Sequence, residues 1–166
     1  MMRVVVAMLA VGLALAGSAS AFPNGAPWGS ANPKVQPNCS SCHFDEEAVT
    51  ESGAIVLSGL PDHAVGGEVY DLTLKLKMPV EGATGFLISA NNGAFSAQRP
   101  DLEFRGSEIR SISPSAGSEV QWTFTWAAPA SWEKPVVFEI GVNAANDDAS
   151  PFGDEIHFRT YGVDAK

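Results

Sequence analysis

The amino-acid sequence predicts an all-β protein that folds as a single antiparallel β-sandwich. Apolar and polar residues alternate along residues 68–77, 119–127 and 135–144, which is the pattern of a strand with one buried face. Turn residues separate about seven strand-like segments, a spacing that suits a sandwich. No strand pattern alternates with a long helical pattern, and this disfavours a parallel α/β fold.

The apolar rows of these segments identify the candidate core. They comprise Tyr70, Leu72, Leu74 and Leu76 in the first segment, Val120, Trp122, Phe124 and Trp126 in the second, and Val136, Phe138, Ile140 and Val142 in the third. Further strands are expected at 55–57, 85–90, 101–113 and 155–161. The only candidate helical turn, residues 44–49, is too short to make the domain helical.

The first 21 residues have the features of a secretory signal peptide. Arg3 precedes the apolar run 4–16, and the small residues 17–21 fit a cleavage site. The apolar run of 13 residues is shorter than the roughly 18 that a membrane-spanning helix needs. We therefore expect residues 22–166 to be exported as one domain, located in the periplasm, outside the cell or at the cell surface, with no stable membrane insertion after cleavage.

The charge balance limits the classes of partner. Removal of Arg3 with the signal peptide lowers Lys plus Arg from 10 to 9 against 19 acidic residues, so the net charge goes from -9 to -10. Such a chain disfavours nucleic acid and anionic lipid as partners. Basic partners are attracted to it instead.

Residues 22–50 are expected to form an irregular arm ahead of a sandwich at residues 51–166. The arm is rich in residues that break helices and strands, namely Pro23, Gly25, Pro27, Gly29, Pro33 and Pro37. Phe22 and Trp28 supply apolar anchors that pack it on the domain.

The arm contains both cysteines of the chain, in the pattern C-x-x-C-H. In c-type haem attachment two thiols at this spacing bond the porphyrin vinyl groups, and the following histidine binds the iron. Cys39 and Cys42 are therefore predicted to attach one covalent haem c, with His43 as the proximal iron ligand. Export agrees with this prediction, because the thiols meet oxidising conditions outside the cytoplasm.

Three other interpretations of the cysteine pair are open. A zinc site needs about four ligands, and the sequence has no second C-x-x-C. A redox dithiol should open a helix after a strand, whereas this pair follows the proline-rich run 32–37. A plain exported disulfide between Cys39 and Cys42 is the main alternative to haem.

The chain resembles the bacterial reeler-like β-sandwich proteins, also called choice-of-anchor V domain proteins. The resemblance covers nearly all of the exported sequence and rests on FPNGAP at 22–27, NCSSCH at 38–43, LP at 60–61, GEVY at 67–70, GF at 85–86, WAAP at 126–129, VNAAN at 142–146 and GD at 153–154. It implies an immunoglobulin-like sandwich in an exported or cell-surface setting, and little about biochemistry.

The sequence departs from that family in two places. Members often end in a membrane or sorting anchor, whereas this sequence stops at Lys166 in a polar tail. Members also often carry a histidine in the segment that matches residues 109–113, and this chain has none there. A distal iron ligand from that segment is therefore not expected.

The remaining candidates for a distal ligand are His63, His157, Met78 and the lysines. His63 is preferred, because its glycine-flanked loop can move to meet the iron. Met78 continues an apolar row and is expected in the core. His157 is out of register with its apolar neighbours and is expected to face solvent.

The loop 143–154 carries oxygen donors of the type that calcium uses, but it lacks the spacing of an EF-hand. We interpret it as a polar turn between two strands, closed by Asx hydrogen bonds.

These observations favour an exported monohaem c-type cytochrome that transfers single electrons to a redox partner protein with a basic patch. One alternative is a binding or adhesion module in which the haem is structural. Another is a haem protein that handles gas or peroxide. No serine-histidine-acid set or paired-carboxylate motif indicates a different enzyme, so an electron carrier is expected rather than a catalyst.

Overall fold

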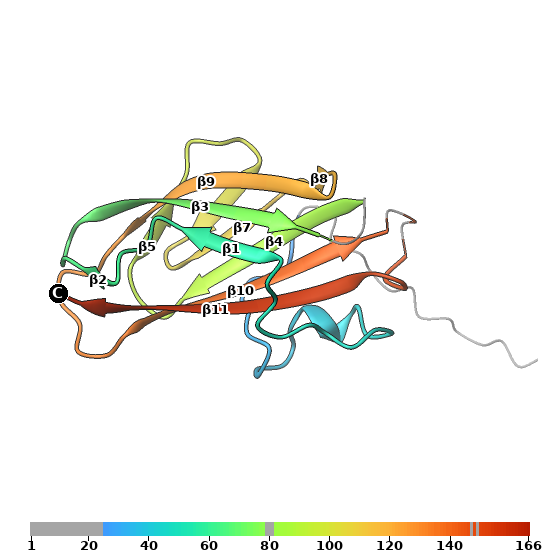
Figure 1. The fold of residues 1–166 in the computed structure, drawn as a ribbon, viewed down its shortest axis with the longest axis horizontal. Coiled ribbons are helices and arrows are strands. Elements are labelled where there is room, and N and C mark those ends of the chain that lie inside the picture. Colours follow the sequence, from blue (N-terminus) through green and yellow to red (C-terminus); the bar gives the residue numbers. More distant parts are fainter. Residues whose placement is uncertain (1–24, 79–81, 147, 149) are drawn as a thin grey trace, which may run out of the picture.

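In the computed structural model, two β-sheets pack face to face, and the N-terminal arm lies against the outer side of one of them (Figure 1). The structure describes residues 25–78, 82–146, 148 and 150–166. The predicted signal peptide and the first residues after it lie outside this range. The predicted all-β sandwich is confirmed, with eleven strands and one 3-10 turn in the described part of the chain.

The smaller sheet has the order β1-β3-β9-β5, and all its pairs are antiparallel. Its strands are β1 (Ile55–Ser58), β3 (Val69–Lys77), β5 (Ala94–Ser96) and β9 (Glu119–Ala127). The register sets Leu74 opposite Trp122, and the predicted apolar rows face inwards along both long strands.

The larger sheet has the order β2-β11-β10-β4-β7-β6, with β8 paired to one end of β4. Its strands are β2 (His63–Ala64), β4 (Ala83–Ala90), β6 (Leu102–Arg105), β7 (Glu108–Ser111), β8 (Ser115–Ala116), β10 (Val136–Ala145) and β11 (Glu155–Ala165). Among the named strands of the described residues, the short β2–β11 pair is the parallel one. The single strand predicted at 101–113 is instead a hairpin, because the chain turns at Gly106, where φ is +59°.

The main core lies between the two sheets and is rich in aromatic rings. Trp126 and Phe138 meet edge to face with their centroids 5.0 Å apart, and Phe86 packs on Trp122 at 4.8 Å. Each large side chain buried in this way contributes about 1.5–3 kcal/mol to folding. Met78 is buried in the same core, as predicted.

A second buried layer lies between the arm and the outer face of the larger sheet. Gly141 of β10 pairs with Leu87 of β4 on one side and with Phe158 of β11 on the other, so the three residues share that outer face. Leu87 and Phe158 are fully buried although they point away from the main core. The arm therefore covers a face that the sandwich alone would leave exposed.

Polar contacts fasten the arm to successive strands. Trp28 stacks on the guanidinium of Arg110 at 4.3 Å, the backbone N–H of Gly29 donates to Glu108 at 2.7 Å, and Asn32 donates to Glu139 at 2.6 Å. Burial raises the pKa of Glu139, and the hydrogen bond from Asn32 opposes that rise. Farther along, the N–H groups of Val49 and Ser52 donate to carbonyl groups of β11.

His157 is buried, which corrects the prediction that it faces solvent. It pairs with Val142 and lies on the core side of β11, while Ile156 and Phe158 lie under the arm. Both faces of β11 are covered here, so burial does not alternate. Ser52 contacts the His157 Nδ1 atom at 2.9 Å and satisfies it.

Candidate functional site

A cavity of about 550 Å³ opens between the arm and the larger sheet, and Cys39, Cys42 and His43 all line it. This volume lies in the range of about 300–1,000 Å³ that is usual for cofactor and ligand sites. Most of its other walls are apolar or small side chains, among them Trp28, Phe44, Ala83, Gly85, Ile112, Pro114, Gly141 and Pro151. The structure therefore brings the three predicted site residues to one mainly apolar cavity.

A short 3-10 turn, η1 (Cys39–Ser41), holds the two cysteines. Asn38 caps this turn: its side-chain oxygen accepts from the N–H of Ser40 at 3.0 Å, and its own N–H donates to the Ser41 hydroxyl at 2.9 Å. The buried Asn38 amide also donates to the carbonyl groups of Asn32 and Pro33. The site predicted from the sequence does not include Asn38, although an asparagine directly before the turn is a recognisable cap signal.

The two thiols have different surroundings. Cys39 is partly buried against β10, and its Sγ lies 3.4 Å from the carbonyl oxygen of Ser30. Burial raises the pKa of the Cys39 thiol from 9.0 to about 11, although a hydrogen bond with Ser30 opposes the rise. Cys42 is exposed at the opening, and neither sulfur is in a disulfide. Cys39 is thus a protected neutral thiol.

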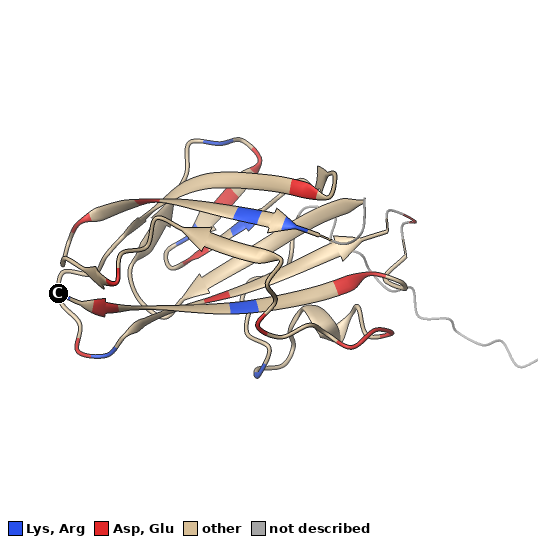
Figure 2. Cartoon of the chain, viewed as in Figure 1, with Lys and Arg blue, Asp and Glu red and all other residues tan. Residues whose placement is uncertain are grey.

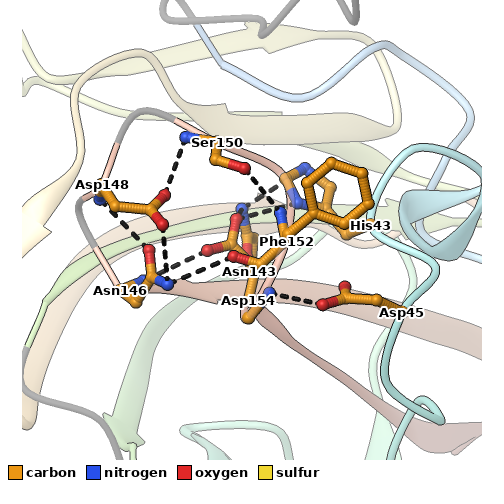
Figure 3. A network of polar contacts seen from close by, with 9 residues as sticks. His43, Asp45, Asn143, Asn146, Asp148, Ser150, Phe152 and Asp154 are labelled. Atoms are coloured by element: carbon orange, nitrogen blue, oxygen red, sulfur yellow. Dashed lines mark hydrogen bonds and ion pairs between the residues drawn. The ribbon is translucent and has the colours of Figure 1, made fainter.

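His43 extends from the end of the turn towards the loop that joins β10 and β11 (Figure 3). Its Nδ1 lies 2.8 Å from Oδ2 of Asp154, and its Nε2 lies 3.5 Å from Nδ2 of Asn143. The ring N–H is not aligned with the carboxylate oxygen, so the buried Nδ1 has a charged neighbour but no well-formed hydrogen bond. Neither Asp154 nor Asn143 is predicted from the sequence to lie beside His43.

The β10–β11 loop forms a network of Asx hydrogen bonds (Figure 3). The N–H of Asp148 donates to the Asn146 side chain at 3.1 Å, the N–H of Ser150 donates to Asp148 at 2.8 Å, and the N–H of Asn146 donates to Asp154 at 3.1 Å. These contacts are those of the polar turn that the sequence predicts. The described residues contain no group of three or more His, Cys, Asp or Glu side chains placed to hold a metal ion.

His63 lies at the other end of the sandwich. It is in β2, where it pairs with Asp164 near the end of β11, whereas Asp154 immediately precedes the start of that strand. From Asp154 to Asp164 the chain advances ten residues, which is roughly 33 Å at about 3.3 Å per residue. The structure therefore does not bring His63 to His43 or to the cavity that His43 lines. Met78 and His157 are also absent from the described cavity lining.

The residues present fit a covalent haem. Two thiols and an imidazole line one cavity with mainly apolar walls, which is the donor set and the environment that haem c requires. Gly141 on the cavity floor has no side chain, and this leaves room for Cys39. A Cβ at Gly141 would lie 3.0 Å from the Cys39 sulfur. An acidic side chain stands behind the imidazole nitrogen that would not bind iron.

The architecture places the chain among β-sandwich modules with a reeler-like fold. The human F-spondin reeler domain (fragment 1) superimposes with a TM-score of 0.50 at 19% identity, covering 73% of this chain and 93% of that one. The Reelin-N domain of F-spondin gives 0.50 at 20%, with 73% and 90% covered, and fragment 2 of the human domain gives 0.50 at 18%, with 72% and 96% covered. No family model matches the chain, and the comparison with curated proteins found no match. At these identities the likeness shows the fold alone.

Proposed function

We propose that this protein is an exported monohaem c-type cytochrome that transfers single electrons. The observation that carries the proposal is the meeting of Cys39, Cys42 and His43 in one mainly apolar cavity. The two thiols would hold the haem as thioethers, and His43 would be the proximal ligand. When bound, haem supplies the one-electron chemistry of its iron.

The other cavity residues have supporting tasks in this proposal. The buried Asp154 carboxylate faces His43 Nδ1 and leaves Nε2 as the iron-binding nitrogen. The side chains of Trp28, Ile112 and Pro114 form apolar walls that would shield the bound haem from water. Burial of this kind tunes the reduction potential of a haem.

A partner surface adjoins the cavity. The rings of Phe44 and Phe152 meet edge to face at 5.8 Å, and both are more than half exposed. The exposed acidic residues Asp45, Glu46 and Glu47 follow directly, and Figure 2 shows acidic colour along the turn after η1. An apolar centre with an acidic border suits a redox partner that presents a basic patch.

The proposed setting is outside the cytoplasm, in the periplasm or at the cell surface. The predicted signal peptide supports this location, and so does a cysteine pair suited to haem attachment, which occurs after export. Among the described residues, no helix is both long enough and apolar enough to span a membrane.

A binding or adhesion module with a structural haem is the second candidate. The exposed pair of Phe44 and Phe152 favours it, because an aromatic surface also suits stable protein binding. Voltammetry separates the two candidates. An electron carrier exchanges electrons rapidly and reversibly at an electrode, whereas a purely structural haem exchanges them slowly. Partner binding adds a second comparison, because a module with structural haem binds its partner equally well in both oxidation states.

Co-expression with a cytochrome c maturation system tests the proposal. The intact mass of the denatured protein should exceed that of the apo chain by one haem, and Cys39→Ser with Cys42→Ser should lose it. Ser58→Ala, which changes an exposed residue of β1, is the control for expression. A mass lower by only two hydrogens would establish the disulfide and exclude the cytochrome.

A further inference from the structure

We infer that Asp154 is a positioning residue for His43: its carboxylate charge, 2.8 Å from Nδ1, favours the ring with the proton on Nδ1 and strengthens Nε2 as a ligand for iron. The iron part of this inference rests on the proposed function. The position of the proton on the His43 ring is set by residues of the chain, so this part of the inference does not depend on haem attachment.

The Asp154 carboxylate is held in one orientation. Its side chain is 2% exposed. Oδ1 accepts the backbone N–H of Asn146 at 3.1 Å, and Oδ2 accepts the side-chain amide of Asn143 at 3.2 Å. The preceding residue is fixed as well, because the N–H of Gly153 donates to Asp45 at 2.6 Å. Asp154 therefore cannot turn away from His43 without breaking these bonds.

The tautomer of His43 follows from the orientation of Asn143. A carboxylate only accepts hydrogen bonds, so the Asn143 atom beside Asp154 Oδ2 must be the amide nitrogen. The same amide nitrogen faces His43 Nε2 at 3.5 Å. Because an N–H group faces Nε2 and a carboxylate lies beside Nδ1, the favoured ring of the haem-free chain carries its proton on Nδ1 and a lone pair on Nε2. Iron would replace the Asn143 contact at that lone pair.

A buried carboxylate behind a ligating imidazole also changes the iron. A carboxylate beside the ring nitrogen that does not bind the metal makes the ligating nitrogen more basic. Oδ2 of Asp154 lies 2.8 Å from Nδ1, although the ring N–H does not point straight at it. A stronger donor stabilises the oxidised iron more than the reduced iron, which lowers the reduction potential. Asp154 would thus lower the reduction potential of this haem.

The proton position is tested on the apo protein, without haem. Nitrogen-15 NMR of the haem-free full chain with both thiols reduced, at a pH where the imidazole is neutral, should show the Nδ1–H tautomer for His43. His43→Gln identifies the signal among the three histidines of the chain. The Asp154→Asn variant should move the proton largely to Nε2. Protonated Nε2 in the wild type overturns the inference. This wild-type measurement remains valid even if Asp154→Asn fails to fold.

The consequence for the iron is tested on the haem-loaded protein. Asp154→Asn should favour the reduced form at least tenfold at a fixed applied potential, a rise of about 59 mV for a one-electron couple. Asp45→Asn is the matched control, because it removes one negative charge from the same network while its side-chain oxygen can still accept the Gly153 N–H. Equal shifts in both variants would show a general charge effect and refute the strengthened ligand. Failure to attach haem would sink the proposed function and leave the tautomer result intact.

Discussion

The sulfur of Cys39 lies directly over the backbone of Gly141. A Cβ added to Gly141 would come within 3.0 Å of that sulfur and 3.3 Å of the Cα of Ala31. Gly141 is in the middle of β10, and its lack of a side chain lets the η1 turn approach the sheet. The position of the candidate haem-attachment motif thus depends on a glycine far away in the sequence.

Gly141→Val should displace the η1 turn. We expect a loss of about 1–3 kcal/mol in the free energy of unfolding, the usual cost of overpacking. Haem attachment should fall more sharply than stability, because the displaced turn carries both thiols. Urea denaturation and the fraction of chains that carry haem by mass measure the two effects.

Gly162→Val is the matched control for that substitution. Gly162 also lies within a strand of the larger sheet, but a Cβ there would meet nothing within 4 Å. We expect no loss of stability or haem attachment. Similar losses in both variants would show that valine disturbs the sheet rather than the packing of the turn.

The two thiols of the unloaded protein should react at different rates. With its pKa near 11 instead of 9.0, Cys39 holds about 100-fold less thiolate at pH 8, and only the thiolate is alkylated. Cys42, exposed at the cavity opening, should be modified first. Iodoacetamide labelling followed by peptide mass analysis measures both rates, and equal rates would contradict the burial of Cys39.

The same pKa predicts how the stability of the unloaded protein depends on pH. The pKa of Cys39 is higher in the folded chain than its ordinary value of 9.0, so the packed turn is fully stable below about pH 9. Its stability should decline as the pH rises towards 11. Cys39→Ser removes this decline, whereas Cys42→Ser should keep it. Melting curves of the two variants from pH 7 to pH 11 make the comparison.

Strands with one buried face could be predicted from the sequence, and others could not. The strands at 69–77 and 119–127 alternate because one side meets the core and the other meets solvent. β2, β5 and β8 have only two or three residues, too few to show a period. The arm covers the outer face of β11, so Ile156 and Phe158 are buried on that face and His157 lies on the core side. The prediction that His157 faces solvent assumed that only one face of this strand is buried.

Some residues of the candidate site could likewise be predicted from the sequence, and others could not. Cys39, Cys42 and His43 are close in sequence, so their spacing alone predicts that they act together. Asp154 and Gly141 reach them only through the packing of the arm on β10 and the loop beyond it. A single sequence carries no signal for such a contact.

His43→Ala should leave the sandwich folded. The main core lies between the sheets, whereas His43 is on the outer side, and its side chain is 25% exposed. We expect a change of about 1 kcal/mol or less in the free energy of unfolding. Trp122→Ala, in the core, should cost about 3–5 kcal/mol. Loss of β circular dichroism in His43→Ala at room temperature would show that this residue is part of the fold.

Arg110→Ala should loosen the arm. The guanidinium stacks on Trp28 at 4.3 Å and donates to the carbonyl oxygen of Ala26 at 2.6 Å, so it holds two points of the arm on β7. Losing a cation–π contact and a hydrogen bond should cost about 1–2 kcal/mol, and local opening should become about 5- to 30-fold more frequent. Hydrogen exchange at the Gly29 amide, which donates to Glu108, reports that opening. Arg99→Ala is the control, because Arg99 pairs with Asp101 in the loop between β5 and β6. If Gly29 exchanges equally fast in both variants, Arg110 does not fasten the arm.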